Sequence, residues 1–84
     1  MKVTDLSANK LFDISLEYGL GSFDYMADDE RNGVHLLPLL PQEWKKFRAC
    51  FERFGKVETA TVDHTNTLFL PLPTLLEMEK WQAN

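Results

Sequence analysis

The most reactive side chains in the sequence are one thiol, Cys50, and two imidazoles, His35 and His64. A thiolate beside an imidazole is the nucleophile and base pair of cysteine hydrolases, and it requires a partly exposed cysteine with a lowered pKa. Cys50 instead adjoins an aromatic stripe, where small buried thiols are common. We therefore expect an unreactive thiol, no catalytic residues and no enzymatic activity.

Metal-ligand chemistry is not indicated either. A zinc site uses three or four closely spaced ligands, which one cysteine and two scattered histidines do not supply. The acidic residues Asp24, Asp28, Asp29 and Glu30 lack the Asp-x-Asp-x-Asp-Gly order of a calcium loop. We expect no metal, no cofactor and a solvated acidic loop.

Interface chemistry is better represented, because the chain contains six Phe, two Trp and two Tyr residues. The central helix described below fills much of the core of a small domain, so some aromatic side chains should remain outside, where Trp and Tyr often anchor interfaces. An acidic run beside them would steer a basic partner. We expect the functional surface in residues 20–31, with a competing interpretation in which its two aromatic residues cap the core. The candidate partner-binding residues are Phe23, Tyr25, Asp28, Asp29, Glu30 and Trp81.

A second candidate surface is basic. Residues 41–56 contain five of the nine basic residues and two acidic ones, whereas the segments on either side are acidic. Lys45, Lys46 and Arg53 form a possible face for nucleic acid or an acidic partner. A helix followed by a Thr-rich hairpin resembles the recognition helix and wing of winged-helix DNA-binding domains. That architecture needs another helix just before the recognition helix, and the segment from Val34 to Pro41 leaves no room for it. Nucleic acid is therefore the second-ranked partner.

The elements that position these side chains follow from the apolar pattern, most clearly in residues 41–54. Trp44, Phe47, Phe51 and Phe54 are spaced three, four and three apart, which predicts one buried stripe of a helix. Pro41 suits the first helical turn, and a left-handed Gly55 would end the helix.

The N-terminal segment fits two patterns. Ser7 as an N-cap and Gly19 as a terminator predict a helix, whereas the strict alternation of apolar residues from Phe12 to Tyr18 predicts a strand. We favour the helix because it explains both flanks. Residues 22–31 are predicted to be a short helix or a loop.

The remaining segments predict a small sheet and a last helix. Residues 34–37, 57–63 and 67–71 are short, apolar or β-branched runs typical of strands. The Pro38-Leu-Leu-Pro41 connector has polyproline-ligand spacing, but its leucines are expected in the core. Thr74 and Glu77 match a capping box, which predicts a helix to about Gln82.

These elements predict an α+β fold: one domain over residues 1–84, with helices packed on a short antiparallel β-hairpin or three-stranded sheet. A single cysteine fits a reducing compartment, which favours the cytoplasm, and no apolar run suggests a membrane partner. We expect a small acidic non-enzymatic regulator or inhibitor, with a phage or plasmid as one candidate source, that occupies a protein partner's surface. Homodimerisation stays open, and a nucleic-acid-binding regulator is the alternative.

Overall fold

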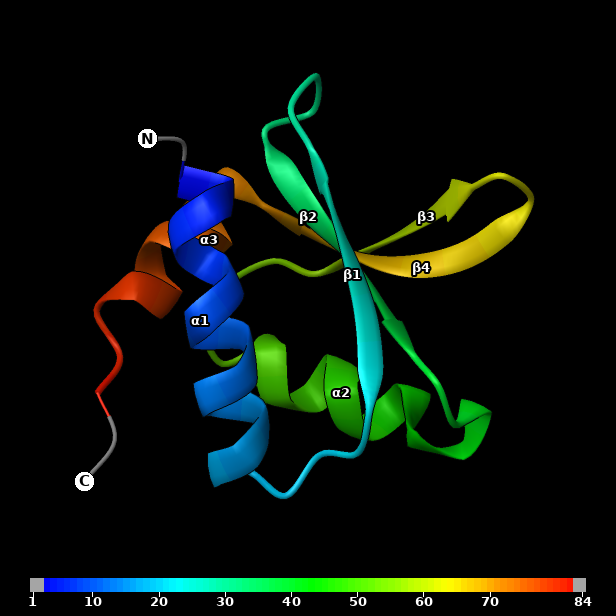
Figure 1. The fold of residues 1–84 in the computed structure, drawn as a ribbon, viewed down its shortest axis with the longest axis horizontal. Coiled ribbons are helices and arrows are strands. Elements are labelled where there is room, and N and C mark those ends of the chain that lie inside the picture. The colour runs from blue at the N-terminus through cyan, green and yellow to red at the C-terminus, as the bar shows by residue number, and fades with distance from the viewer. Residues whose placement is uncertain (1–2, 83–84) are drawn as a thin grey trace.

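A four-stranded antiparallel sheet with three helices on one side makes up the fold, shown in the computed structural model in Figure 1. The structure describes the backbone of residues 3–82 and the side chains of residues 9–82. The expected α+β class is confirmed. The elements in chain order are α1 (Val3–Glu17), β1 (Phe23–Asp28), β2 (Gly33–Pro38), a 3₁₀ turn (Pro41–Glu43), α2 (Trp44–Phe51), β3 (Glu58–Val62), β4 (Thr65–Pro71) and α3 (Leu72–Glu79).

The sheet has the strand order β1-β2-β4-β3, one strand more than the largest sheet expected. The additional strand is β1, so the prediction of a helix or loop over residues 22–31 was wrong. Phe23 and Tyr25 alternate with Asp24 and Met26, and this period of two, with two aromatic residues, favours a strand. β1 pairs with β2 from Phe23 opposite Pro38 to Asp28 opposite Gly33.

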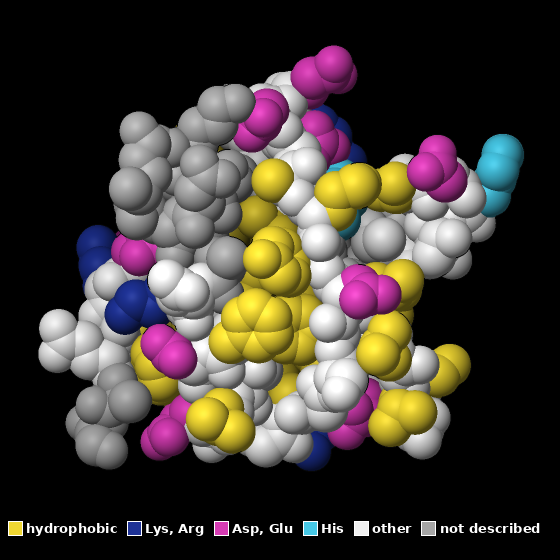
Figure 2. All heavy atoms as spheres, viewed as in Figure 1, with side chains coloured by type: hydrophobic (Ala, Val, Ile, Leu, Met, Phe, Trp, Pro, Cys, Tyr) yellow, Lys and Arg dark blue, Asp and Glu magenta, His cyan; other side chains and the backbone are white. Residues whose placement is uncertain are grey.

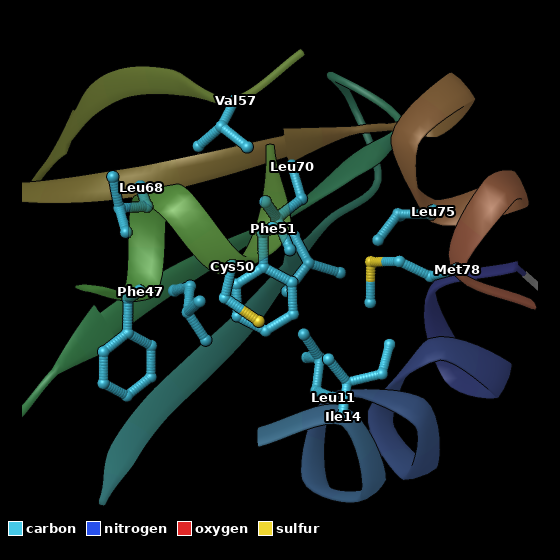
Figure 3. Packing of buried hydrophobic residues seen from close by; sticks show 12 residues of the cluster. Leu11, Ile14, Phe47, Cys50, Phe51, Val57, Leu68, Leu70, Leu75 and Met78 are labelled. Atoms are coloured by element: carbon cyan, nitrogen blue, oxygen red, sulfur yellow. The ribbon is translucent and has the colours of Figure 1, made fainter. Parts of the chain in front are cut away.

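The hydrophobic core lies between the sheet and the helices, as the close view in Figure 3 shows. α2 contributes Phe47 and Phe51, which are fully buried, while Trp44 and Phe54 at the ends of the predicted stripe are only partly buried. The stripe prediction therefore holds for its centre. Cys50 of α2, Val57 and side chains from α1, α3 and both central strands complete the core: Leu11, Ile14, Val34, Leu36, Leu68, Leu70, Leu75 and Met78.

α2 is shorter than the predicted helix of residues 41–54. Pro41 opens a 3₁₀ turn rather than the α-helix, and the chain after Phe51 tightens into bonds from Arg53 N–H to Cys50 O and from Phe54 N–H to Phe51 O. Gly55 has φ 152°, so it is not the left-handed helix terminator that we expected. A side chain there would meet the Thr74 hydroxyl, which lies 2.8 Å from the position of an added Cβ.

α1 confirms the helical interpretation of the N-terminal segment, but it begins at Val3, so Ser7 lies inside it and is not an N-cap. Its C-terminus is a Schellman motif. Gly19 has φ 68°, the Leu20 N–H donates to Ser15 O at 2.8 Å, and the Gly19 N–H donates to Leu16 O at 3.3 Å. This turn leads the chain directly from α1 into β1.

α3 begins at Leu72 after Pro71 and has no side-chain cap, so the predicted capping box does not form. Thr74 is fully buried, and its hydroxyl donates to Lys56 O at 2.6 Å instead. Pro71 and Pro73 fix the backbone angles at the start of the helix, where no side chain caps it. The connector after β2 also differs from expectation, because Leu39 and Leu40 are 52% and 47% exposed rather than buried.

The β3–β4 hairpin turns through two residues, Asp63 and His64, whereas the predicted strands 57–63 and 67–71 leave residues 64–66 for the turn. Both residues have positive φ, 48° and 67°, as a type I′ turn requires. In Figure 1 this hairpin projects away from the helices. The helices cover one face of the sheet. The opposite face is not covered by helices, and the β1–β2 and β3–β4 hairpins border it.

Candidate functional site

An aromatic cluster joins α1 to β1 and is partly open to solvent. The ring of Phe12 lies 5.1 Å from Phe23 and 5.9 Å from Tyr25, centroid to centroid. Phe12 is 52% exposed and Tyr25 43% exposed, while Phe23 is half-buried and packs against Phe47 of the core at 5.8 Å. We call Phe12, Phe23 and Tyr25 the aromatic surface. Figure 2 shows a band of hydrophobic side chains between α1 and β1.

A hollow of about 340 Å³ adjoins the aromatic surface. It forms where the turn after α1 leads into β1. Hollows bordered by aromatic rings are the places where interfaces accept an anchoring side chain. Its lining residues are Phe12, Ser15, Leu20, Gly21, Ser22 and Phe23.

β1 is also an edge strand, because within residues 3–82 β2 is its only neighbour in the sheet. Natural edge strands are commonly protected by Lys, Pro or a bulge, and β1 contains neither Lys nor Pro. The other edge, β3, is partly occupied at its start: Arg48 donates to Val57 O at 3.1 Å and to the Thr59 hydroxyl at 2.5 Å. β1 is thus the edge better suited to accept another strand.

The segment of sequence that carries this edge is acidic. From Phe12 to Glu30 the sequence holds six acidic residues and no Lys or Arg. Asp13 and Asp24 are exposed on the two elements that carry the aromatic surface. A field of this kind attracts a basic partner and repels an acidic one.

Asp28 has a partner inside the molecule. Its Oδ2 lies 2.8 Å from His35 Nε2, and its Oδ1 accepts the Arg31 N–H at 3.1 Å. The hydrogen bond with His35, followed by that from the Arg31 backbone, holds the pKa of the Asp28 carboxyl below its ordinary value. Of the predicted acidic rim, Asp28 is therefore held by the fold and only partly exposed, while Asp29 and Glu30 are exposed.

His35 connects Asp28 to a hydroxyl on β4. Its Nδ1 lies 3.0 Å from the Thr67 Oγ1, and its ring packs 4.9 Å from Phe69. Carboxylate, imidazole and hydroxyl in this order resemble a hydrolase relay. However, His35 and Thr67 are only 4% and 5% exposed, and the Thr67 hydroxyl also reaches Ala60 O at 3.5 Å. We interpret the relay as a structural link between the strands.

Sequence spacing could not reveal this link, because Asp28 and Thr67 are 7 and 32 residues from His35. Phe12 was missed as an interface residue for a related reason. It was read only as part of a helix-or-strand pattern, and its neighbours come from β1, which was not predicted as a strand. The alternation of Phe23 and Tyr25 with Asp24 and Met26 was the signal that would have identified β1 as the strand beside Phe12. No such signal marks the link through His35.

Trp81 lies apart from the aromatic surface. It is partly buried against the core, and Lys10 of α1 lies over its ring at 5.8 Å while donating to its carbonyl oxygen. In Figure 1 the C-terminal segment and β1 are on opposite sides of α1. Trp81 and the aromatic surface therefore do not form one site.

The basic candidates are exposed but not all free. Lys46 donates to Gly19 O at 2.9 Å, and the guanidinium of Arg53 lies over the Tyr18 ring at 4.8 Å. Both side chains thus fasten α2 to the end of α1. Lys45 is exposed beside them, so the structure does not present these cations as one unengaged row.

Cys50 is buried in the core, and burial raises the pKa of its thiol to about 11. It lies on the helix side of the sheet, whereas His35 is on the opposite face, so no Cys–His pair forms. Among the residues with described positions, no three His, Cys, Asp or Glu side chains are arranged to hold a metal ion.

Comparisons with protein families, curated proteins and solved structures find no match to this chain. Within residues 3–82, no helix is both long enough and apolar enough to cross a membrane.

Proposed function

We propose that this protein is a non-enzymatic regulator or inhibitor that binds an extended, basic segment of a partner protein along β1. The observation that carries the proposal is the position of the exposed aromatic surface directly at an edge strand. An added strand would gain main-chain hydrogen bonds from β1 and side-chain contacts from the rings of Phe12 and Tyr25. Occupying that segment would block the partner's own use of it.

The acidic field supplies selectivity in this proposal. Basic residues in the partner segment would meet Asp13 and Asp24, and long-range attraction would speed association at low ionic strength. We place the activity in the cytoplasm, since a single buried cysteine suits a reducing compartment.

A second copy of this chain suits the edge less well. A two-fold dimer through β1 would set two acidic stretches against each other, because an isologous interface pairs each patch with itself. Nucleic acid is the weaker alternative function, since Lys46 and Arg53 already have partners within the fold.

Selection of peptides from a random display library tests the proposal. We expect enrichment of peptides that alternate apolar residues and contain Lys or Arg. In hydrogen exchange, a selected peptide should slow the β1 amides and leave those of the other edge, β3, unchanged. Protection of β3 instead, or of neither edge, would contradict strand addition at β1.

A further inference from the structure

The face of the sheet opposite the helices forms a groove between the two hairpins. Strand alternation places the side chains of Met26, His35, Leu37, Val62 and Thr67 on this face, while Val34, Leu36, Leu68 and Leu70 point to the core. The groove has a volume of about 240 Å³. Figure 2 shows hydrophobic and acidic side chains in the angle between the hairpins.

The groove combines apolar walls with acidic residues. Met26 is 47% exposed, and Leu37 and Val62 are partly exposed beside it. His35 and Thr67 also line the groove, but they are buried and hydrogen-bonded to each other. Asp24 and Asp63 are exposed, come from different hairpins and both line the groove. An apolar trough with carboxylates suits a side chain that has an aliphatic stem and a cationic head.

The chain's own Arg31 shows that this face accepts such a group. Its guanidinium lies 4.1 Å from the centroid of Phe69, a β4 residue whose ring packs against His35. The groove continues from His35 toward Asp24 and Asp63, where the lining contains no Lys or Arg.

We propose that the groove is a subsite for a Lys or Arg side chain of the segment that pairs with β1, an inference that rests on the proposed function. A partner residue opposite Met26 would place its side chain on the same face, and long side chains reach diagonal neighbours about 7–8 Å away. Its stem would lie on Met26 and Leu37, and its head would meet the carboxylates of Asp24 and Asp63.

The test uses small probes that cannot pair as strands with β1. Nα-acetyl-arginine methylamide and Nα-acetyl-lysine methylamide are titrated into the protein, with the norleucine derivative as an uncharged control, while methionine methyl groups are followed by NMR. We expect the Met26 methyl to shift with both basic probes, and Met78, which is fully buried in the core, to stay unchanged. An unresponsive Met26, or an equal response to norleucine, would overturn the proposal.

Paired variants locate the cationic head. Asp24→Asn and Asp63→Asn should each weaken binding of the basic probes about two- to fivefold, as expected for an exposed charge pair. Glu52→Gln, which removes an exposed carboxylate just after α2 and outside the groove lining, is the control and should have no effect. Equal effects of all three variants would assign the binding to general acidity and contradict the subsite. The two proposals can be contradicted independently. The probe titration tests only the subsite, whereas hydrogen exchange of the β1 amides tests only strand addition.

Discussion

His35 is held by hydrogen bonds at both ring nitrogens, and its partner Asp28 gives the fold a specific acid sensitivity. Because the pKa of Asp28 is lower in the folded protein than its ordinary value of 3.8, the ionised carboxylate stabilises the fold above that value. That contribution is lost as pH falls through the lowered pKa.

We therefore predict that Asp28→Asn destabilises the protein at pH 5 and that the difference from wild type shrinks as pH is lowered below about 4. Denaturant unfolding at a series of pH values measures it. Asp24→Asn is the control, because Asp24 is exposed on the same strand. A difference that stays constant down to pH 2 would show that the Asp28 carboxylate has no stabilising partner.

The pKa of the Cys50 thiol is shifted in the opposite direction, upward. Its thiol is buried among apolar side chains, and its pKa is raised to about 11, so little thiolate is present at neutral pH. We predict no reaction with Ellman's reagent at pH 8 in the folded protein and full reaction after denaturation. Rapid labelling of the folded protein would place the thiol at the surface.

At the scale of elements, the β3–β4 hairpin stores strain at its tip. His64 has φ 67°, a left-handed conformation that costs a non-glycine residue about 1–2 kcal/mol. His64→Gly should stabilise the protein by about 0.5–1 kcal/mol after the entropy of the more flexible unfolded chain is subtracted. His64→Ala keeps the Cβ and should give no comparable gain. A fall in the denaturation midpoint of the glycine variant would contradict the type I′ assignment.

α2 supplies the centre of the core, so Phe51→Ala should cost about 3–5 kcal/mol of unfolding free energy. Phe12→Ala removes the same ring from a position that is 52% exposed and should cost far less. Chemical denaturation of the two variants measures the contrast. Similar losses would mean that Phe12 is structural and poorly suited to an interface.

The sequence predicted these elements unevenly, for physical reasons. α2 and the β3–β4 hairpin follow from periodicity, because one face of each is buried against the core. β2 follows from its short apolar run, and α1 from its flanks, of which Gly19 ends the helix while Ser7 lies inside it. β1 was missed because its residues 24–27 are all exposed and show no buried face, and because the acidic run of residues 28–30 favoured a helix end or a loop. The partners of Phe12 were missed with it. Thr74 matched a cap motif, but its hydroxyl is used by the Lys56 carbonyl, a contact 18 residues away.

At the scale of the whole molecule, the helices leave two features of the sheet uncovered: the outer edge of β1 and the groove between the hairpins. Of the candidate residues named from the sequence, the structure gathers Phe23 and Tyr25 at that edge and leaves Trp81 elsewhere. The central claim is that the aromatic surface at this edge is where a partner binds.

The affinity of one library-selected peptide for three forms of the protein tests that claim most directly. Tyr25 and Leu76 are matched, since they are 43% and 45% exposed on β1 and α3. We predict that Tyr25→Ala weakens binding about tenfold or more, as for an anchoring aromatic residue, while Leu76→Ala binds like wild type and both variants keep the wild-type melting temperature. Unchanged binding by Tyr25→Ala, or an equal loss in Leu76→Ala, would contradict the assignment of β1 as the binding edge.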